Sequence, residues 1–158
     1  MERPVLLVDT REKKPFDFEG DDSFLEIKHT KLEVGDYTLE GLENIIVIER
    51  KNSADELFMN FTANRERIKA EFERMSSVKI KILLIEESCE DIFNPYHYYV
   101  NKKPNKKNIK MPVAVVAQNL TDLMLLHNVH ILFVGGRGKA MLKGLLLKAF
   151  ELHRKGKI

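Results

Sequence analysis

The chain has 158 residues, which allows one domain of ordinary size and leaves no room for two full ones. Hydrophobic residues make up 44% and charged residues 32%, so the chain can bury a core, and no apolar run approaches the ~18 residues of a membrane helix. The single cysteine, Cys89, excludes an internal disulfide framework and a cysteine-rich zinc site. With no signal-peptide pattern at the N-terminus, we expect a cytoplasmic location and no membrane partner.

The net charge of +2 conceals an uneven distribution along the chain. Residues 1–100 carry 14 Lys and Arg against 22 Asp and Glu, a net charge of −8. Residues 101–158 carry 12 against 2, a net charge of +10. This division indicates a phosphate-bearing partner, although a basic segment is often only solvated surface.

The first half of the chain is typical of short strands separated by loops and turns. An apolar run at 4–9 ends in a carboxylate and predicts a buried strand, and residues 24–30 predict a second. Residues 37–39 and 45–49 predict two more strands, joined by a turn that contains Gly41. We expect these strands to follow one another as a meander.

The second half predicts alternating helices and strands. Ser53 and Glu56 form a capping-box pattern that begins a helix running to about Phe61. A long basic connection spans 95–111. The other predicted elements are helices at 64–75, 112–127 and 139–154 and strands at 79–86 and 129–134. This order predicts one α/β domain over 1–158, with three layers and a central mixed sheet flanked by helices.

Four ionisable residues follow predicted strands or turns: Asp9, Asp36, Glu49 and Lys51. Glu49 and Lys51 are two residues apart on extended chain, so their side chains leave the same face of the sheet. A carboxylate beside a lysine can bind a hard divalent cation while the lysine orients a water or balances charge on a phosphate. Asp36 could supply a second metal oxygen. Solvated charges at a strand end would give the same spacing, so the residues alone leave both interpretations open.

Several segments together resemble the nuclease domain of the XPF family, within the PD-(D/E)xK superfamily. Residues 8–12 match its V-D-x-R-E signature, residues 35–37 match G-D-Y, and residues 49–55 match E-R-K-x-x-x-D. Residues 65–72 are similar to the arginine-bearing helix that follows, and the likeness continues to about Phe150. No helix-hairpin-helix pattern follows, so the chain looks like the single-domain members found in phages and bacteria.

The resemblance implies a restriction-endonuclease-like fold and cleavage of DNA phosphodiesters with Mg²⁺ or Mn²⁺ as cofactor. Asp36, Glu49 and the main-chain carbonyl of Arg50 match the positions of the metal ligands, and Lys51 matches the catalytic lysine. Arg50 is therefore assigned to both the metal site and the catalytic set.

The resemblance also assigns residues around this centre. Asp9 resembles a further carboxylate of the site, and Arg11 and Asp55 resemble residues that hold the scissile phosphate or the basic side chains. Arg67 resembles the arginine that faces DNA, although an exposed arginine on a solvated helix face fits equally well. The leucine expected directly after Asp55 is displaced by Glu56.

The connection at 95–111 offers a second candidate for DNA binding. Lysines following a cluster of aromatic residues can track a phosphate backbone, while the alternative is a solvated loop. The lysines are Lys102, Lys103, Lys106, Lys107 and Lys110.

The C-terminal helix carries a broad apolar face, which with the family resemblance predicts a homodimer through the C-terminal helices. The alternative is a core helix packed on the sheet. The glycine-rich segment 135–139 lacks the residue order of a P-loop, so no nucleotide cofactor is expected and a nucleotide-binding protein is disfavoured.

The sequence therefore predicts a metal-dependent DNA endonuclease, selective for branched, flap or junction DNA. The alternative is a non-catalytic DNA-binding or scaffold subunit of a nuclease complex. The complete acidic set together with Lys51 favours the enzyme.

Overall fold

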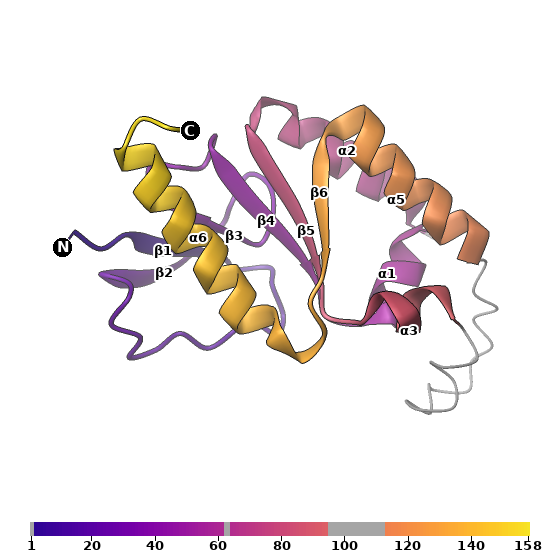
Figure 1. The fold of residues 1–158 in the computed structure, drawn as a ribbon, viewed down its shortest axis with the longest axis horizontal. Coiled ribbons are helices and arrows are strands. Elements are labelled where there is room, and N and C mark those ends of the chain that lie inside the picture. Colours follow the sequence, from indigo (N-terminus) through magenta and orange to yellow (C-terminus); the bar gives the residue numbers. More distant parts are fainter. Residues whose placement is uncertain (1, 62–63, 95–112) are drawn as a thin grey trace.

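A computed structural model describes residues 2–61, 64–94 and 113–158 (Figure 1). Its centre is a six-stranded sheet in the order β2-β1-β3-β4-β5-β6. The strands are β1 (Val5–Asp9), β2 (Glu26–Thr30), β3 (Tyr37–Leu39), β4 (Ile46–Lys51), β5 (Ile80–Ile85) and β6 (Val129–Phe133). β3 is antiparallel to both β1 and β4, whereas β4, β5 and β6 are parallel. The mixed sheet confirms the predicted fold class.

The meander predicted for the first strands is wrong at β2, which pairs with β1 in parallel at the edge of the sheet. The connection between the two strands is long enough to return to the start of β1, as a parallel pair requires. Phe18 and Phe24 anchor this connection in the core, and the Leu25 N–H donates to the Pro4 carbonyl over 2.8 Å. Hydrophobic alternation reveals a strand but not its partner.

The helices cover both faces of the sheet, which confirms the three layers. α6 packs on one face against β3, β4 and β5, while α1 and α5 contact β4 and β6, and α2 packs with α1 and α5 on that second face (Figure 1). In the described residues, none of the helices is long and apolar enough to cross a membrane. The helices are α1 (Ala54–Phe61), α2 (Arg65–Arg74), α3 (Cys89–Phe93), α5 (Val113–His127) and α6 (Gly138–Arg154), with 3₁₀ turns at Met75–Ser77 and Gly135–Arg137. α3 has no counterpart among the predicted elements.

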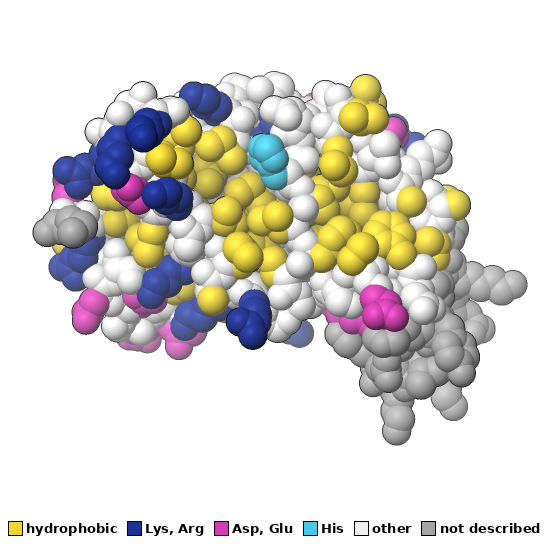
Figure 2. All heavy atoms as spheres, in the orientation of Figure 1, with side chains coloured by type: hydrophobic (Ala, Val, Ile, Leu, Met, Phe, Trp, Pro, Cys, Tyr) yellow, Lys and Arg dark blue, Asp and Glu magenta, His cyan; other side chains and the backbone are white. Residues whose placement is uncertain are grey.

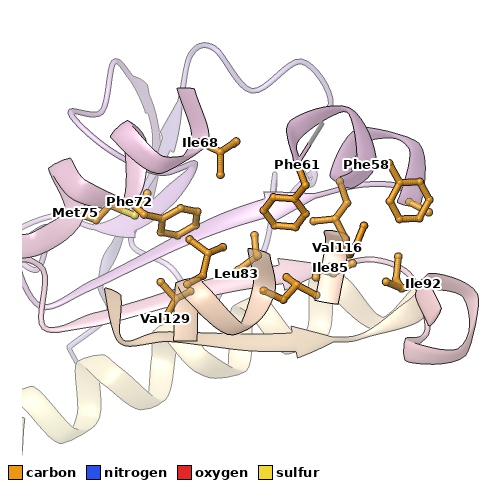
Figure 3. Close-up of a cluster of buried hydrophobic side chains, with 14 of the residues drawn as sticks. Phe58, Phe61, Ile68, Phe72, Met75, Leu83, Ile85, Ile92, Val116 and Val129 are labelled. Carbon is orange, nitrogen blue, oxygen red and sulfur yellow. The ribbon is translucent and has the colours of Figure 1, made fainter. Parts of the chain in front are cut away.

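Each face of the sheet buries its own hydrophobic cluster. The cluster beneath α1, α2 and α5 includes Phe58, Phe72, Leu83, Ile85 and Val116 (Figure 3). The cluster beneath α6 includes Leu6, Val8, Tyr37, Ile46, Ile48, Leu84 and Leu142.

Alternation along β4 decides which way the candidate site residues point. Val47 belongs to the cluster beneath α1 and α2, and Ile46 and Ile48 belong to the cluster beneath α6. Because side chains alternate along a strand, Glu49 and Lys51 share the face of Val47, and Arg50 shares the face of Ile48. The β1–β3 register, extended by one residue, places Asp9 opposite Asp36.

A tight turn at Gly35 carries the chain into β3. Gly35 has φ of +72°, and a Cβ built there would lie 2.1 Å from Val47 Cγ1. A side chain would therefore be strained in its backbone and would also collide with a buried valine.

We expect Gly35→Ala to lower the free energy of unfolding by about 2–4 kcal/mol, measured by urea denaturation. Gly41→Ala is the matched control, because Gly41 has φ of +80° with open space around its Cβ position. That change should cost only the backbone strain, about 1–2 kcal/mol. Equal losses in the two variants would show that contact with Val47 is unimportant.

Candidate active site

A cavity of about 630 Å³ opens where β1 and β4 end and β3 begins, with α2 along one side. Its lining is almost entirely charged or polar. The lining residues include Asp9, Arg11, Glu12, Lys13, Lys14, Asp36, Glu49, Lys51, Glu56, Arg67, Glu71 and Arg74. The structure thus brings the predicted residues Asp9, Arg11, Asp36, Glu49, Arg50, Lys51 and Arg67 to one cavity.

Two neighbouring carboxylates form the centre of the cavity. The Asp36 Oδ2 atom accepts a hydrogen bond from the Arg50 backbone N–H over 2.7 Å. Glu49 is only 4% exposed; its Oε1 accepts from Lys51 Nζ over 2.5 Å, and its buried Oε2 has no hydrogen-bond partner among the described residues.

The environment of these carboxylates opposes their ionisation. Burial raises the pKa of Asp36 to about 7, because the Arg50 N–H and the Lys51 charge offset that effect only in part and Glu12 and Glu71 add to it. Burial also raises the pKa of Glu49 well above its ordinary value. The charge of Lys51 lowers this pKa, and the negative charge of Asp36 offsets part of that lowering. A bound cation would relieve both costs.

Lys51 remains the charged partner of this pair. Burial lowers the pKa of Lys51, but the charge of Glu49 and the hydrogen bond to Glu49 raise it by more, so the net shift of the pKa is upward. The Nζ atom also lies 3.9 Å from Glu56 Oε1. The lysine therefore stays cationic at the floor of the cavity.

Helix α1 brings Glu56, rather than Asp55, to the cavity. The Glu56 N–H donates to Ser53 Oγ over 3.2 Å, as the capping-box pattern predicts, and Glu56 Oε2 accepts from the Asn52 N–H over 3.0 Å. Asp55 is half-buried and does not line the cavity, so its catalytic role stays a prediction. Burial of Ala54 and Leu57 sets the rotation of the helix, and the displaced leucine was the sequence signal that could have identified Glu56.

Asp9 is engaged by its surroundings on both carboxylate oxygens. It accepts from Arg11 N (2.6 Å), Arg11 Nε (2.9 Å), Arg11 Nη2 (2.7 Å) and Leu32 N (3.0 Å). Arg11 Nη2 also donates to the Leu32 carbonyl over 2.8 Å. Burial raises the pKa of Asp9, but these bonds outweigh it and leave the pKa below its ordinary value. In this structure the pair fastens the end of β1 to the loop that carries Asp36.

Arg50 uses its side chain away from the carboxylate pair. Its Nε donates to Glu86 Oε1, its Nη1 donates to the Lys14 carbonyl over 2.7 Å, and its guanidinium lies 4.2 Å from the centre of the Phe16 ring. The side chain therefore holds the loop after β1 against the sheet. The predicted role of the Arg50 carbonyl in metal binding stays a prediction.

Four cations at the mouth of the cavity have no acidic partner among the described residues. Lys13 and Lys14 stand on the loop after β1, and Arg67 and Arg74 stand on α2. All four are exposed. Of these, only Arg67 was predicted; Arg74, like the carboxylate Glu71, could have been found from helical spacing with Arg67. The five predicted lysines of 95–111 lie outside the described residues.

The donor set fits a divalent cation of the Mg²⁺ type. In residues 2–61, 64–94 and 113–158, no group of three or more His, Cys, Asp and Glu side chains is arranged to hold a metal ion. A site here would rest on two carboxylates, and Mg²⁺ often binds through one or two carboxylates while keeping several waters. The unpartnered Glu49 Oε2 is an oxygen that such an ion would satisfy.

The fold and the site define an α/β domain of the type seen in XPF structures. XPF from Aeropyrum pernix in complex with DNA matches with a TM-score of 0.65 at 16% identity, over 94% of this chain and 66% of that one. A second structure of XPF from Aeropyrum pernix matches with a TM-score of 0.63 at 14% identity, over 94% of this chain and 68% of that one. The chain thus spans about two thirds of these proteins. No curated protein sequence matches it.

The chain belongs to the ERCC4 domain family, whose family model matches residues 8–139. This match confirms the resemblance to XPF proteins.

Burial of the Asp36 carboxyl group predicts a pH-dependent effect on stability. The pKa of Asp36 is raised from an ordinary 3.8 to about 7 in the folded chain, so between these values folding takes up a proton and stability falls as pH rises. We expect Asp36→Asn to raise the free energy of unfolding by about 1–3 kcal/mol at pH 8 and by less at pH 5. Urea denaturation in EDTA measures both values. A gain that is the same at both pH values would contradict this account.

Proposed function

We propose that this chain is a divalent-metal-dependent endonuclease that hydrolyses DNA phosphodiester bonds. The observation that carries the proposal is the pair Asp36 and Glu49 beside Lys51 in the lining of a charged cavity, with a buried Glu49 oxygen that has no hydrogen-bond partner among the described residues. Membership of the ERCC4 domain family and the likeness to an XPF protein described in complex with DNA support the substrate class.

The residues divide the work of hydrolysis between them. Asp36 and Glu49 would hold Mg²⁺ or Mn²⁺, which when bound would polarise the phosphate and lower the pKa of a water. Lys51 is a fixed positive charge at the same face, able to orient the attacking water or to balance charge that develops on the phosphate. In-line attack would release the 3′ oxygen and leave a 5′ phosphate.

The four cations at the mouth of the cavity, which have no acidic partner in the part of the chain that the structure describes, support binding of the phosphate backbone. Lys13 and Lys14, on the loop after β1, and Arg67 and Arg74, on α2, line the same cavity as the carboxylate pair. Phosphates on either side of the reacting one would compensate these charges and release counterions. We propose that they set the path of the DNA strand, and that selectivity for branched, flap or junction DNA belongs to the same surface.

We also propose a homodimer through the face formed by α6, β6 and α5. Hydrophobic side chains gather across this face in Figure 2, and β6 is an edge strand of the sheet. Leu125 is 78% exposed and Met141 is 43% exposed, while Ile131 and Phe133 are half-buried. An apolar face beside an unpaired strand edge is a surface that a second copy would cover.

The direct test is cleavage of labelled single-stranded, duplex, flap and four-way DNA with Mg²⁺, Mn²⁺ or EDTA. We expect Asp36→Asn, Glu49→Gln and Lys51→Met each to lower the cleavage rate by at least about 100-fold, because each removes a charge from the reacting centre. Circular dichroism checks that each variant folds. Full activity in Lys51→Met, or cleavage by wild type in EDTA, would contradict the mechanism.

The alternative is a non-catalytic DNA-binding or scaffold subunit. Under that reading wild type binds DNA but cleaves none of the four substrates with either metal. The retained carboxylate pair and Lys51 favour the enzyme.

The salt dependence of DNA affinity tests whether the cations at the mouth of the cavity bind phosphates. Each phosphate contact contributes about 0.9 to the slope of log affinity against log salt on duplex DNA. We expect Arg67→Ala and Arg74→Ala each to reduce that slope by about this amount, measured by fluorescence anisotropy in Ca²⁺. Lys157→Ala, an exposed cation beyond the far end of α6, should leave it unchanged. Equal slopes in all four proteins would remove α2 from the DNA path.

A further inference from the structure

Lys51 lies between two carboxylates that belong to different elements. Its Nζ is 2.5 Å from Glu49 Oε1, on its own strand, and 3.9 Å from Glu56 Oε1, in the first turn of α1. The side chains of Lys51 and Glu49 are 7% and 5% exposed, while that of Glu56 is 40% exposed. The lysine thus sits at the bottom of the cavity and Glu56 stands above it toward the opening.

The proposed metal site places Lys51 in competition with the cation. A cation on Glu49 Oε2 would share one carboxylate with the ammonium, which is bonded to Oε1, so the two positive charges would repel each other and weaken the bond of Lys51 to Glu49. Asp36 also attracts Lys51, and a cation bound to Asp36 would weaken that attraction as well. A buried ammonium that loses its acceptor without gaining another is strongly destabilised. A second acceptor would therefore stabilise Lys51 when Glu49 binds a metal.

Glu56 has the geometry of that second acceptor. Its Oε2 accepts from the Asn52 N–H over 3.0 Å and its own N–H donates to Ser53 Oγ over 3.2 Å, so the residue is anchored at both ends. No hydrogen bond to Oε1 exists among the described residues, and Oε1 is the oxygen that faces Lys51. The 3.9 Å between Lys51 Nζ and Glu56 Oε1 is longer than a hydrogen bond, so the exchange requires the ammonium to move toward Glu56.

We propose that Lys51 exchanges partners, bonding Glu49 Oε1 in the metal-free protein and Glu56 Oε1 when Asp36 and Glu49 hold a divalent cation. Glu56 is then a positioning residue, which keeps the ammonium at the cavity floor while Glu49 is occupied. The inference rests on the metal site of the proposed function. It also gives a role to Glu56, which lies one residue after the expected Asp55, as the acceptor for Lys51.

The exchange predicts a coupling between Glu56 and Lys51 that appears in metal affinity. Without Glu56, cation binding leaves the ammonium only the Glu49 carboxylate that it shares with the metal, so Glu56→Gln should weaken Mn²⁺ binding about 5- to 20-fold. In a Lys51→Met background there is no ammonium for Glu56 to accept a hydrogen bond from, so Glu56→Gln should leave the Mn²⁺ affinity unchanged. Isothermal titration of the DNA-free protein with Mn²⁺ gives all four affinities, and the Mn²⁺-induced rise in melting temperature gives an independent readout.

Two further variants separate exchange from a simple long-range charge effect. Glu56→Asp keeps the charge but shortens the reach, so exchange predicts weaker Mn²⁺ binding and a long-range effect predicts none. Glu66→Gln removes an exposed acid from the first turn of α2, outside the cavity, and should leave the affinity unchanged. If Lys51→Met fails to fold, Lys51→Gln replaces it.

The outcomes distinguish failure of the exchange from failure of the metal site. If Glu56→Gln weakens Mn²⁺ binding equally in the wild-type and Lys51→Met backgrounds, or if Glu56→Asp binds like wild type, the exchange is wrong while the metal site stands. If wild type binds Mn²⁺ no better than Glu49→Gln, the metal site and the proposed function fail, and the exchange fails with them.

Discussion

The structure depends on holding two carboxylates close together in a place that disfavours their charge. Asp36 precedes β3 and Glu49 lies near the end of β4, so pairing of these two strands brings the carboxylates together. Burial raises the pKa of both carboxyl groups, and the negative charge of Asp36 raises that of Glu49 further. Such an arrangement persists only when surrounding structure offsets its cost, and relief by a cation is its simplest use.

The surrounding structure supplies that support from three directions. The turn at Gly35 packs against Val47 so closely that no side chain fits at position 35, just before β3. The Asp9–Arg11 pair fastens the loop before Asp36 through Leu32, and the Arg50 backbone N–H fixes the Asp36 carboxylate itself. Each of these contacts acts on position rather than on the reacting atoms. The two carboxylates are therefore held in place by the protein itself, as the proposed electrostatic catalysis would require.

Side chains alternate along β4, so the residues proposed to take part in the reaction lie on one face of the sheet and the side chain that holds the neighbouring loop lies on the other. Glu49 and Lys51 face the cavity beneath α1 and α2, whereas the Arg50 guanidinium joins Glu86, the Lys14 carbonyl and the Phe16 ring. The three consecutive charged residues of this motif thus serve two sides of one sheet. The side chain of the middle residue ties the loop of Lys13 and Lys14, on which the proposed DNA path depends, to the same strand that carries the carboxylate.

Sequence reasoning reached most of this site because short motifs marked the strand-end residues and because the resemblance to the XPF family assigned roles to them and to Arg11 and Arg67. Apolar runs that end in Asp9 and Glu49, and the turn before Tyr37, identify strand ends on one edge of a sheet. It missed what non-local packing decides. The parallel partner of β1 depends on a long connection anchored by Phe18, and the choice of Glu56 over Asp55 depends on how Ala54 and Leu57 rotate α1 into the core. Lys13 and Lys14 reach the cavity through a loop whose path no periodic pattern encodes.

The central claim is that Asp36 and Glu49 together hold a divalent cation, and anomalous diffraction from crystals containing Mn²⁺ tests it most directly. The account predicts an anomalous peak between the two carboxylates, about 2.0–2.2 Å from an oxygen of each. No peak at this position, at an Mn²⁺ concentration that supports cleavage, or a peak at other residues instead, would contradict it.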